Sequence, residues 1–593
     1  MKFNNLFLVL VLIFVISLGA VSAAEDSDIE TGVLATADGM SLDTAVEGDL
    51  AESGVVDESL DSSADADSVD DDLGESERID ETGVLSINDL NQNNQLKENN
   101  LEGYVNITED NVDDYFDSDG RLIAPNNLKF KGNFDGSNMN FNMFIINETV
   151  DMDFNSAIFN DIGFNLTAPN LEIRNTYFGI NNDNYLNNAV ISINADNITV
   201  DNVEFLIYAP FDNDCIMIDV ENSNNAILSN LDVTYLMMPQ LLGTYELDNY
   251  NYIIKLVNSN YTSIVHNTFL AHLLLKSVNF NVFEFPSTDT DLVAAIAVQG
   301  SNYLNLSNNS IYVFANQQRA NTLPTLDSII IVKSNNSIVS NNNITETDLN
   351  ASGSNYLYAL DVYEMSNLTV YNNTINVDSN GGSTSPNGAG AAYPIQITGP
   401  IGSMYIHDNR LTTTNHGPNL GIFSQNYYGD TNLTIYNNVI NVTGRATNDY
   451  YSLVSGMELE DTYAEVYNNT INVVNDLAYS SSNNIYGISY YQTTYNNPHV
   501  FKVYNNTIVT NGHYAVYLKS SSGTQVYNNS LKTYDLCCNN AVYIQSGSIS
   551  DNYCTCVNCT CNSTNHCSST NNINMASVND MKKIIFSQLL WLI

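Results

Sequence analysis

Positive charge is scarce in this chain. Its 593 residues include only 18 lysines and arginines against 67 aspartates and glutamates, which gives a formal net charge of −49. A nucleic-acid-binding protein needs a basic surface to neutralise phosphates, so that class is excluded. Apolar runs of about 18 or more residues, which bilayer-spanning helices need, are missing apart from the extreme N-terminus. A polytopic membrane protein is therefore excluded as well.

Charged residues of both signs together make up only 14% of the chain, and tryptophan occurs once. Soluble domains usually contain roughly 25% charged residues. Asparagine replaces them here: there are 93, about one residue in six. The acidic residues are unevenly placed, because 21 of them, with the single base Arg78, lie between Glu25 and Glu81. The rest of the chain is expected to have a surface of neutral amides and hydroxyls.

The N-terminus is typical of an export signal. Lys2 precedes an apolar run from Leu6 to Leu18, and small residues follow up to Ala24. This pattern predicts a signal peptide over residues 1–24, with an uncleaved anchor helix as the alternative. Residues 25–84 are acidic and poor in aromatics, which predicts a disordered spacer. It serves either as a solvated stalk or as a linker or pro-segment with no partner of its own.

A short phrase recurs through the body of the chain. It consists of a β-branched or aromatic alternation, a polar pair ending in Asn, a small residue and an apolar one. Clear copies are Leu-Thr-Val-Tyr-Asn-Asn-Thr-Ile at 368–375, Leu-Thr-Ile-Tyr-Asn-Asn-Val-Ile at 433–440 and Ala-Glu-Val-Tyr-Asn-Asn-Thr-Ile at 464–471. Periods of about 20–50 residues indicate solenoids, propellers or arrays.

The last Asn of each polar pair marks one position of the repeat. Successive positions are 27, 28, 37, 42, 33, 31, 36, 29, 31, 37, 23 and 23 residues apart, which describes a coil of fixed girth with inserted loops. The predicted corner residues are Asn175, Asn202, Asn230, Asn267, Asn309, Asn342, Asn373, Asn409, Asn438, Asn469, Asn506, Asn529 and Asn552.

These features predict an all-β protein, a right-handed parallel β-helix over residues 151–553. The runs alternate with period two and are rich in Val, Ile, Thr and Tyr, which favours strands over helices. Asn tolerates the left-handed conformation of a tight corner. Stacked in successive coils, these residues can hydrogen-bond as an amide ladder. A propeller, the structural alternative, needs about 40–45 residues per blade, and the spacing of 23 is too short for it.

The segments at the two ends of the predicted solenoid do not follow the repeat. Residues 85–150 are expected to form an N-terminal cap, with a strand, a short helix capped near Thr108 and a turn within residues 103–124. Residues 554–593 contain a Cys-x-Cys-x-x-Cys-x-Cys run from Cys554 to Cys561. This tail is either a Cys-rich cap or a truncated or frame-shifted C-terminus. In an exported protein disulfides are expected there ahead of a zinc site.

The combination resembles a known family. The signal peptide, the acidic spacer, the cap with Val-Asn-Ile-Thr at 105–108 and Tyr-Phe-Asp-Ser-Asp-Gly at 115–120, and the Tyr-Asn-Asn-Thr-Ile coils resemble adhesin-like surface proteins of methanogenic archaea. Those proteins carry parallel β-helix repeats. The resemblance covers about residues 100–553, and it implies a secreted or cell-surface location and attachment to glycans, host polymers or other cells.

Catalytic chemistry is sparse. A glycosidase needs two carboxylates on either side of a scissile bond. The few candidates are Asp201 with Glu204, Glu346 with Asp348, Asp408 beside Arg410, and the group Glu458, Glu460 and Asp461. Polygalacturonase-type motifs, metal-ligand spacings of His and calcium-binding glycine-aspartate repeats are absent. We therefore predict no catalytic residue, no cofactor and no metal site.

Asparagine sequons for N-glycosylation are built into the repeat. They include Asn106, Asn147, Asn165, Asn197, Asn260, Asn305, Asn367, Asn372, Asn432, Asn441, Asn468 and Asn505. Exposed ones are expected to be glycosylated, whereas an Asn buried in a ladder is inaccessible.

Three functions follow as hypotheses. The first is a non-catalytic, secreted or surface-displayed adhesin associated with the cell envelope, whose partners are glycans or other cells and not nucleic acid. The second is a β-helix polysaccharide lyase or glycoside hydrolase, which a groove with paired carboxylates near Glu458 to Asp461 would favour. The third is a passive structural component of the envelope. Tyr371, Tyr436, Tyr467, Tyr504 and Tyr527 either stack on sugar faces or simply stack coil on coil.

Overall fold

The computed structural model describes residues 103–181, 189–209, 215–237, 246–247, 251–275, 279–280, 291–317, 325–348, 356–379, 390–426, 431–445, 453–475, 484–491, 501–512, 514–519, 523–533, 541–556 and 565–566. All of these belong to the second of two units into which the chain divides, Leu90–Ile593. The predicted signal peptide, the predicted spacer and nearly all of the predicted Cys-rich tail lie outside the described residues.

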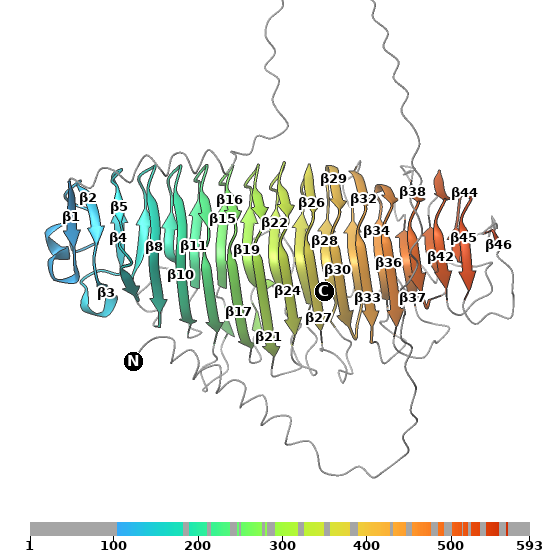
Figure 1. The fold of residues 1–593 in the computed structure, drawn as a ribbon, viewed down its shortest axis with the longest axis horizontal. Helices are drawn as coiled ribbons and strands as arrows, with labels where there is room; N and C mark the ends of the chain where they lie inside the picture. Colours follow the sequence, from blue (N-terminus) through green and yellow to red (C-terminus); the bar gives the residue numbers. More distant parts are fainter. Residues whose placement is uncertain are drawn as a thin grey trace, which may run out of the picture. The chain divides into compact units, whose positions relative to one another are not determined.

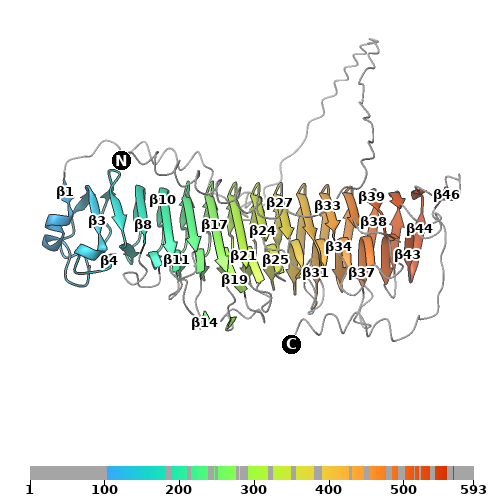
Figure 2. The ribbon, with the colours of Figure 1, turned by 90° about the horizontal axis from the view of Figure 1, so that it is seen from below.

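The fold is the predicted right-handed parallel β-helix. Each coil contributes one strand to each of three parallel sheets, here called sheets I, II and III, and the coils follow one another in sequence order (Figures 1 and 2). The chain passes from sheet III through a turn into sheet I, from sheet I through the Asn corner into sheet II, and back to sheet III. Parallel strands of neighbouring coils lie about 4.8 Å apart.

Sheet I consists of short strands: β12 (Ile227–Ser229), β16 (Ser263–Val265), β20 (Asn305–Ser307), β23 (Ile338–Ser340), β26 (Leu368–Tyr371), β29 (Gly402–His407), β32 (Thr431–Tyr436), β35 (Tyr463–Tyr467), β38 (Phe501–Tyr504), β41 (Thr524–Tyr527) and β44 (Gly547–Ser550). Sheet II consists of β13 (Asp232–Met237), β17 (Thr268–Leu275), β21 (Ser310–Gln317), β24 (Asn343–Asp348), β27 (Thr374–Ser379), β30 (Arg410–Asn415), β33 (Val439–Gly444), β36 (Thr470–Asn475), β39 (Thr507–Thr510), β42 (Ser530–Thr533) and β45 (Tyr553–Cys556).

Over the described residues, sheet III has fourteen strands: β4 (Met143–Ile146), β7 (Gly163–Leu166), β9 (Ala189–Ile193), β11 (Cys215–Glu221), β15 (Asn251–Val257), β19 (Asp291–Gln299), β22 (Thr325–Val332), β25 (Tyr356–Tyr363), β28 (Ala392–Thr398), β31 (Asn419–Gln425), β34 (Leu453–Glu460), β37 (Asn484–Tyr491), β40 (Tyr514–Lys519) and β43 (Val542–Ile544). The long strands β8 (Glu172–Ile180) and β10 (Thr199–Ala209) run through both sheet I and sheet II, and β3 (Asn133–Asp135) and β6 (Ile158–Asn160) precede them. Short pairs are formed by β14 (Glu246–Leu247) with β18 (Asn279–Phe280), and by β46 (Asn565–His566) with β45.

The core fills the inside of the coils. In β27 the side chains of Ile375 and Val377 are buried, and Asn376 between them is half-buried, as period-two alternation requires. The same pattern in successive coils gives one continuous cluster of buried apolar side chains from Ile107 to Cys554. Burying one such side chain contributes roughly 1.5–3 kcal/mol. Because each coil leaves its upper and lower edges to its neighbours, only the stack completes the core.

The N-terminal end is closed by aromatic rings. Residues 104–107 form β1 (Tyr104–Ile107), and the helix predicted near Thr108 is the 3₁₀ helix η1 (Glu109–Asp114). The Thr108 backbone N–H donates to the side chain of Asn111 at 2.8 Å. A small parallel sheet has the order β1, β2 (Asn127–Phe130) and β5 (Met152–Asp153), in which β2 pairs with both others, and η2 (Gly136–Asn138) follows β3. The rings that pack over the first coils belong to Phe116, Phe130, Phe134, Phe141, Phe144, Phe154, Phe159, Phe164 and Phe178.

The solenoid pairing extends beyond the predicted bounds of 151–553 at both ends. It starts at β3 and β4, because β3 already pairs with β6 and β4 with β7. It continues to Cys556, since β45 pairs with β42. The first coils bury phenylalanine and lack the Asn phrase, so the repeat pattern assigns them to the predicted cap. Within the described residues, no helix is long and apolar enough to cross a membrane.

The variable repeat length has one main source. The connection from sheet II to sheet III is three residues between β39 and β40 and fifteen between β17 and β19. The corner between sheets I and II is two residues long in successive coils, for example between β26 and β27 and between β35 and β36. Insertions at one corner therefore leave the register of the strands unchanged.

Candidate functional site

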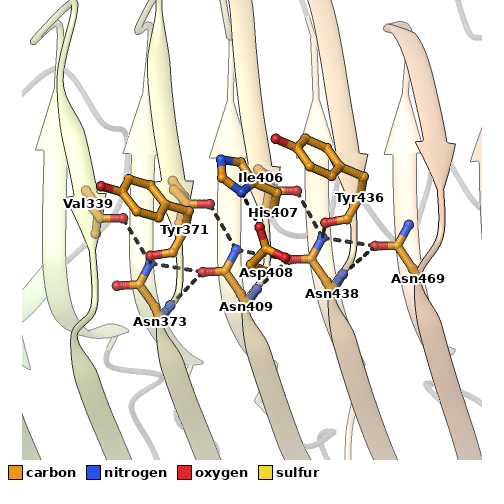
Figure 3. A network of polar contacts seen from close by, with 11 residues as sticks. Val339, Tyr371, Asn373, Ile406, His407, Asp408, Asn409, Tyr436, Asn438 and Asn469 are labelled. Atoms are coloured by element: carbon orange, nitrogen blue, oxygen red, sulfur yellow. Dashed lines mark hydrogen bonds and ion pairs between the residues drawn. The ribbon is translucent and has the colours of Figure 1, made fainter. Parts of the chain in front are cut away.

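Ten of the predicted corner residues form an amide ladder. In each step, the backbone N–H and the side-chain Nδ2 of one Asn both donate to Oδ1 of the Asn in the next coil. Asn373 donates both bonds to Asn409 at 3.0 Å (Figure 3). Nδ2 of Asn409 also donates to the carbonyl of Val370 in the preceding coil at 2.9 Å. The ladder residues, all buried, are Asn267, Asn309, Asn342, Asn373, Asn409, Asn438, Asn469, Asn506, Asn529 and Asn552.

The residue before each ladder Asn turns the chain. It has a positive φ of 53° at Asn372 and 55° at Asp408. Asn and Asp adopt this left-handed conformation at low cost, because their short polar side chains bond locally. The same position is held by His266, Asn308, Asn341, Asn437, Asn468, Asn505, Asn528 and Asp551, all with positive φ.

The first three predicted corner residues are displaced by one position. Asn175, Asn202 and Asn230 are exposed and have positive φ, so they occupy the turning position and not the ladder position. The ladder position of these coils holds Thr176, Val203 and Leu231. Leu231 still donates its backbone N–H to Oδ1 of Asn267 at 2.9 Å. These early coils carry one Asn at the corner, and the sequence phrase alone does not tell which of the two positions it fills.

A column of stacked rings runs along the outside of sheet I, next to the ladder. Tyr436, Tyr467 and Tyr504 lie one above another, with 5.0 Å between ring centroids at each step and planes within 8°. Burial between neighbouring rings raises the pKa of each of these three phenols. The complete column is Tyr371, His407, Tyr436, Tyr467, Tyr504 and Tyr527, and Figure 3 shows its first three rings. Because each inner ring covers its neighbour's face, the column leaves ring edges for solvent, and its rings stack coil on coil.

An open cavity lies beside this column on the outer surface of sheet I. Its volume is about 280 Å³, and its lining comes from β32, β35 and β38. The phrase position two residues before the column ring is Thr434 in β32, Glu465 in β35 and Lys502 in β38. Glu465 and Lys502 form an ion pair. The hydrogen bond that Lys502 donates to Glu465 raises the pKa of Lys502. The complete lining is Asn432, Leu433, Thr434, Tyr463, Ala464, Glu465 and Lys502.

One aromatic side chain, Tyr463, belongs to the cavity lining. Tyr463 is half-buried. Tyr405, 44% exposed, lies on the neighbouring strand β29 opposite Thr434. The sequence pattern does not predict Tyr463 or Tyr405 as site residues. A signal was present, because Glu465 and Lys502 place opposite charges in successive coils at a position that is threonine or glutamine in the other Tyr-Asn-Asn copies of the phrase.

Three of the four candidate carboxylate groups are not arranged for catalysis. Glu346 and Asp348 both point inward from β24 and are fully buried. Asp201 accepts hydrogen bonds of 2.7 Å from the Ser229 hydroxyl and the Asn230 amide. Its proposed partner Glu204 has a pKa raised by burial and by the nearby Asp232.

The Asp408 carboxylate bonds to the ring of its neighbour and not to Arg410. Its Oδ2 lies 2.7 Å from Nδ1 of His407, a member of the aromatic column (Figure 3). Arg410 is exposed at the start of β30. The adjacency of Asp408 and Arg410 in the sequence therefore reflects a corner and the strand that follows it.

Glu458 and Glu460 are the candidate pair that the structure brings together. Both lie on the outward side of β34 and are 1% and 2% exposed, whereas Asp461 turns the chain with φ 50°. Burial raises the pKa of Glu458 well above its usual value, and the Glu460 carboxylate raises it further. Glu460 accepts a hydrogen bond of 2.7 Å from Gln425. Glu458 is therefore electrostatically perturbed, but both side chains are enclosed.

Among the described residues, no three His, Cys, Asp or Glu side chains gather as metal ligands. Cys554 is disulfide-bonded, which agrees with the preference for disulfides over zinc in the Cys-rich run. The sequon residues divide by position. Asn372, Asn468 and Asn505 are exposed turning residues, while Asn165 and Asn441 are half-buried within strands.

Comparisons with known proteins give a likeness to solved structures and no family. No family model and no curated protein matches the chain. A surface adhesin of Streptococcus pneumoniae, PfbA, matches with 11% identity over 65% of this chain and 88% of its own, with a TM-score of 0.32. The tailspike of Escherichia coli bacteriophage HK620, solved with a pentasaccharide, matches with 11% identity over 74% of this chain and 70% of its own, with a TM-score of 0.24. The tailspike of Pseudomonas phage phi297 matches with 10% identity, a TM-score of 0.20 and coverages of 66% and 48%. At these identities and TM-scores, no function is transferred.

Proposed function

We propose that this chain is a non-catalytic, adhesin-like protein, secreted or held at the cell surface, that attaches to glycans, host polymers or partner cells. The cavity over β32, β35 and β38 is the proposed sugar-binding site. The observation that carries the proposal is its lining, in which an aromatic ring, an amide, a hydroxyl and both charges face one small open volume. The export signal predicted over residues 1–24 supports the extracellular location.

The lining suits a sugar ring. Tyr463 offers an apolar ring face with a polar tip, as the C–H face of a pyranose requires. Sugar hydroxyls both donate and accept hydrogen bonds: Glu465 accepts, Lys502 donates, and the Asn432 amide does both. The ion pair between Glu465 and Lys502 holds these two side chains in place before binding. The strands that carry the lining repeat about every 4.8 Å, so an extended polymer can run across several coils.

A glycan array tests this proposal. The full chain is expected to retain a defined set of glycans, and Tyr463→Ala is expected to weaken the binding of at least one of them by about tenfold, as loss of an aromatic anchor does. Tyr312→Ala is the matched control, because Tyr312 is a half-buried tyrosine on the outside of sheet II, away from the cavity. Retention of no glycan by the wild-type chain would leave the passive envelope component as the better account.

A second candidate function rests on Glu458. A carboxyl group whose pKa is raised by burial and by a neighbouring carboxylate, as at Glu458, is the arrangement of a glycosidase acid. Against it, both side chains are at most 2% exposed. Incubation of the full chain with soluble polysaccharides is therefore expected to release no new reducing ends. Release that Glu458→Gln abolishes would establish the hydrolase instead.

A further inference from the structure

The turn between sheet III and sheet I carries a second amide row, on the outside of the molecule. Nδ2 of Asn197 donates to Oδ1 of Asn170, and Nδ2 of Asn225 donates to Oδ1 of Asn197, each at 3.0 Å. Further along, Nδ2 of Asn367 donates to Oδ1 of Asn336 at 2.9 Å. Every one of these residues has a positive φ. Asn is the residue expected at such a position.

Two tyrosines interrupt this row. Tyr261 and Tyr303 occupy the same position in the two coils between Asn225 and Asn336, and their φ values are 57° and 59°. A bulky residue with positive φ is uncommon and strained. Their rings stack with 4.7 Å between centroids and 3° between planes, and the residues are 54% and 49% exposed.

The interruption is confined to one position of the turn. The neighbouring row passes through the same coils without a break: Asn260 donates to Oδ1 of Asn224 at 3.2 Å, and Asn302 donates to Oδ1 of Asn260 at 3.0 Å. The buried serines beside it are also continuous, since Ser301 Oγ accepts the backbone N–H of Ser259 at 2.9 Å. The turn therefore keeps its geometry, and only the outermost side chain changes.

The break leaves hydrogen-bonding groups on both sides of the ring pair. Tyr261 stands at the position where the row would supply an amide donor to Oδ1 of Asn225. Tyr303 likewise stands where the row would supply an amide acceptor to Nδ2 of Asn336. An Asn side chain is shorter than a tyrosine ring, so the outer part of each ring face extends past its neighbour. One ring face thus has an acceptor beside it, and the other has a donor.

We propose that Tyr261 and Tyr303, with Asn225 and Asn336, form a binding site for sugar rings of a glycan. A pyranose stacked on the outer part of a tyrosine face places its hydroxyls beside an amide acceptor at Asn225 or an amide donor at Asn336. Two faces lie on opposite sides of one stacked pair, so two residues of one chain can bind at once. Strained residues that neighbouring coils replace by Asn mark a function that folding does not require.

This site is separate from the cavity of the proposed function, because it lies between coils that begin with β12 and β23, whereas the cavity lies over β32 to β38. Its test compares four full-length proteins: wild type, Tyr261→Asn/Tyr303→Asn, Tyr261→Phe/Tyr303→Phe and Tyr463→Ala. The probes are printed hexasaccharides of α- and β-linked glucose, galactose, mannose and N-acetylglucosamine. The Asn pair continues the existing row, so that variant is expected to fold and to melt at a higher temperature than wild type.

The expected result is at least one hexasaccharide whose binding falls about tenfold in the Asn variant and stays within about threefold in the Phe variant and in Tyr463→Ala. Identical profiles for wild type and the Asn variant would overturn the proposal. Absence of any bound hexasaccharide on the wild-type chain would overturn it too. A change confined to self-association in light scattering would overturn it in favour of contact with a second copy of the chain.

Discussion

Asn373 and Asn409 are joined twice: the backbone N–H and the side-chain Nδ2 of Asn373 both donate to Oδ1 of Asn409 at 3.0 Å. Each ladder amide therefore satisfies a backbone donor at the corner as well as its own side chain. A buried corner would otherwise leave polar groups unpaired at a cost of about 1–3 kcal/mol each. The ladder fixes the register of the coils on which the outer surface of sheet I is built.

Removing one ladder amide should destabilise the solenoid strongly. Asn438 accepts two hydrogen bonds from Asn409 and donates to Asn469, to Ile406 and to Tyr436. Asn438→Ala is expected to lower the free energy of unfolding by about 3 kcal/mol or more, because several buried groups lose their partners. Chemical denaturation measures this.

The matched control for that variant is Asn441→Ala, three residues further along the same coil. Asn441 is half-buried on the outward side of β33, and the effect of its truncation is expected to stay within about 1 kcal/mol. Equal losses of unfolding free energy in the two variants would show that the ladder position contributes no more to stability than an outward-facing position.

Restoring the outer amide row should stabilise the protein. In Tyr261→Asn/Tyr303→Asn, two residues with positive φ become the type that tolerates it, at about 1 kcal/mol each or more. New amide bonds to Asn225 and Asn336 add to this, while one stacked pair worth about 0.5–1.5 kcal/mol is lost. The net expectation is a gain of about 1–3 kcal/mol, read from the melting temperature. A lower melting temperature would mean that the tyrosine pair holds the turn together.

Stability should depend on pH through Glu346. This carboxyl group is buried inside the coils, where burial raises its pKa to about 8, and the Ser328 hydroxyl donates to it at 2.8 Å. In the unfolded chain the group ionises near pH 4.5, so the folded state alone holds the proton between about pH 4.5 and 8. Stability consequently falls as pH rises through this window.

Glu346→Gln removes that dependence. The variant is expected to match wild type near pH 4 and to be more stable near pH 8, by on the order of 2–4 kcal/mol. The difference between the two unfolding curves isolates this group from the other carboxyls. A difference that does not change between pH 4 and 8 would contradict the assignment.

The ion pair at the cavity should matter for binding and little for folding. Glu465 and Lys502 are both partly exposed, and such pairs contribute about 0–1 kcal/mol. Lys502→Met keeps the apolar stem and removes the charge. We expect an unchanged melting temperature and a weaker affinity for the glycans that the array selects. A loss of stability without a loss of affinity would assign the pair to the fold alone.

Much of the fold could be predicted from the sequence, because the repeat imposes the same chemistry on every coil. The repeated phrase that ends in Asn predicts both the corner and the ladder from Asn267 onward. The first coils were harder: phenylalanines such as Phe134 and Phe159 fill their core without the phrase, and one Asn fits either corner position. The solenoid predicted from residue 151 therefore begins after the first paired strands, β3 and β4.

The surface sites could be predicted only in part. Tyr467 and Tyr504 recur in the phrase, which predicts stacking either on sugar faces or on neighbouring coils. In the structure they stack on each other. Tyr463 and Lys502 come from separate coils and meet only after the coils stack, so their positions in the sequence give no sign of a shared cavity. Tyr261 and Tyr303 could have been found as the tyrosines that follow Asn260 and Asn302, where other coils repeat Asn.

A crystal structure of the full chain with the oligosaccharide whose binding Tyr463→Ala weakens most tests the proposed sugar-binding cavity most directly. The account predicts a sugar ring stacked on Tyr463, with hydroxyls bonded to Glu465 and Lys502. An oligosaccharide bound elsewhere, with this cavity empty, would contradict it.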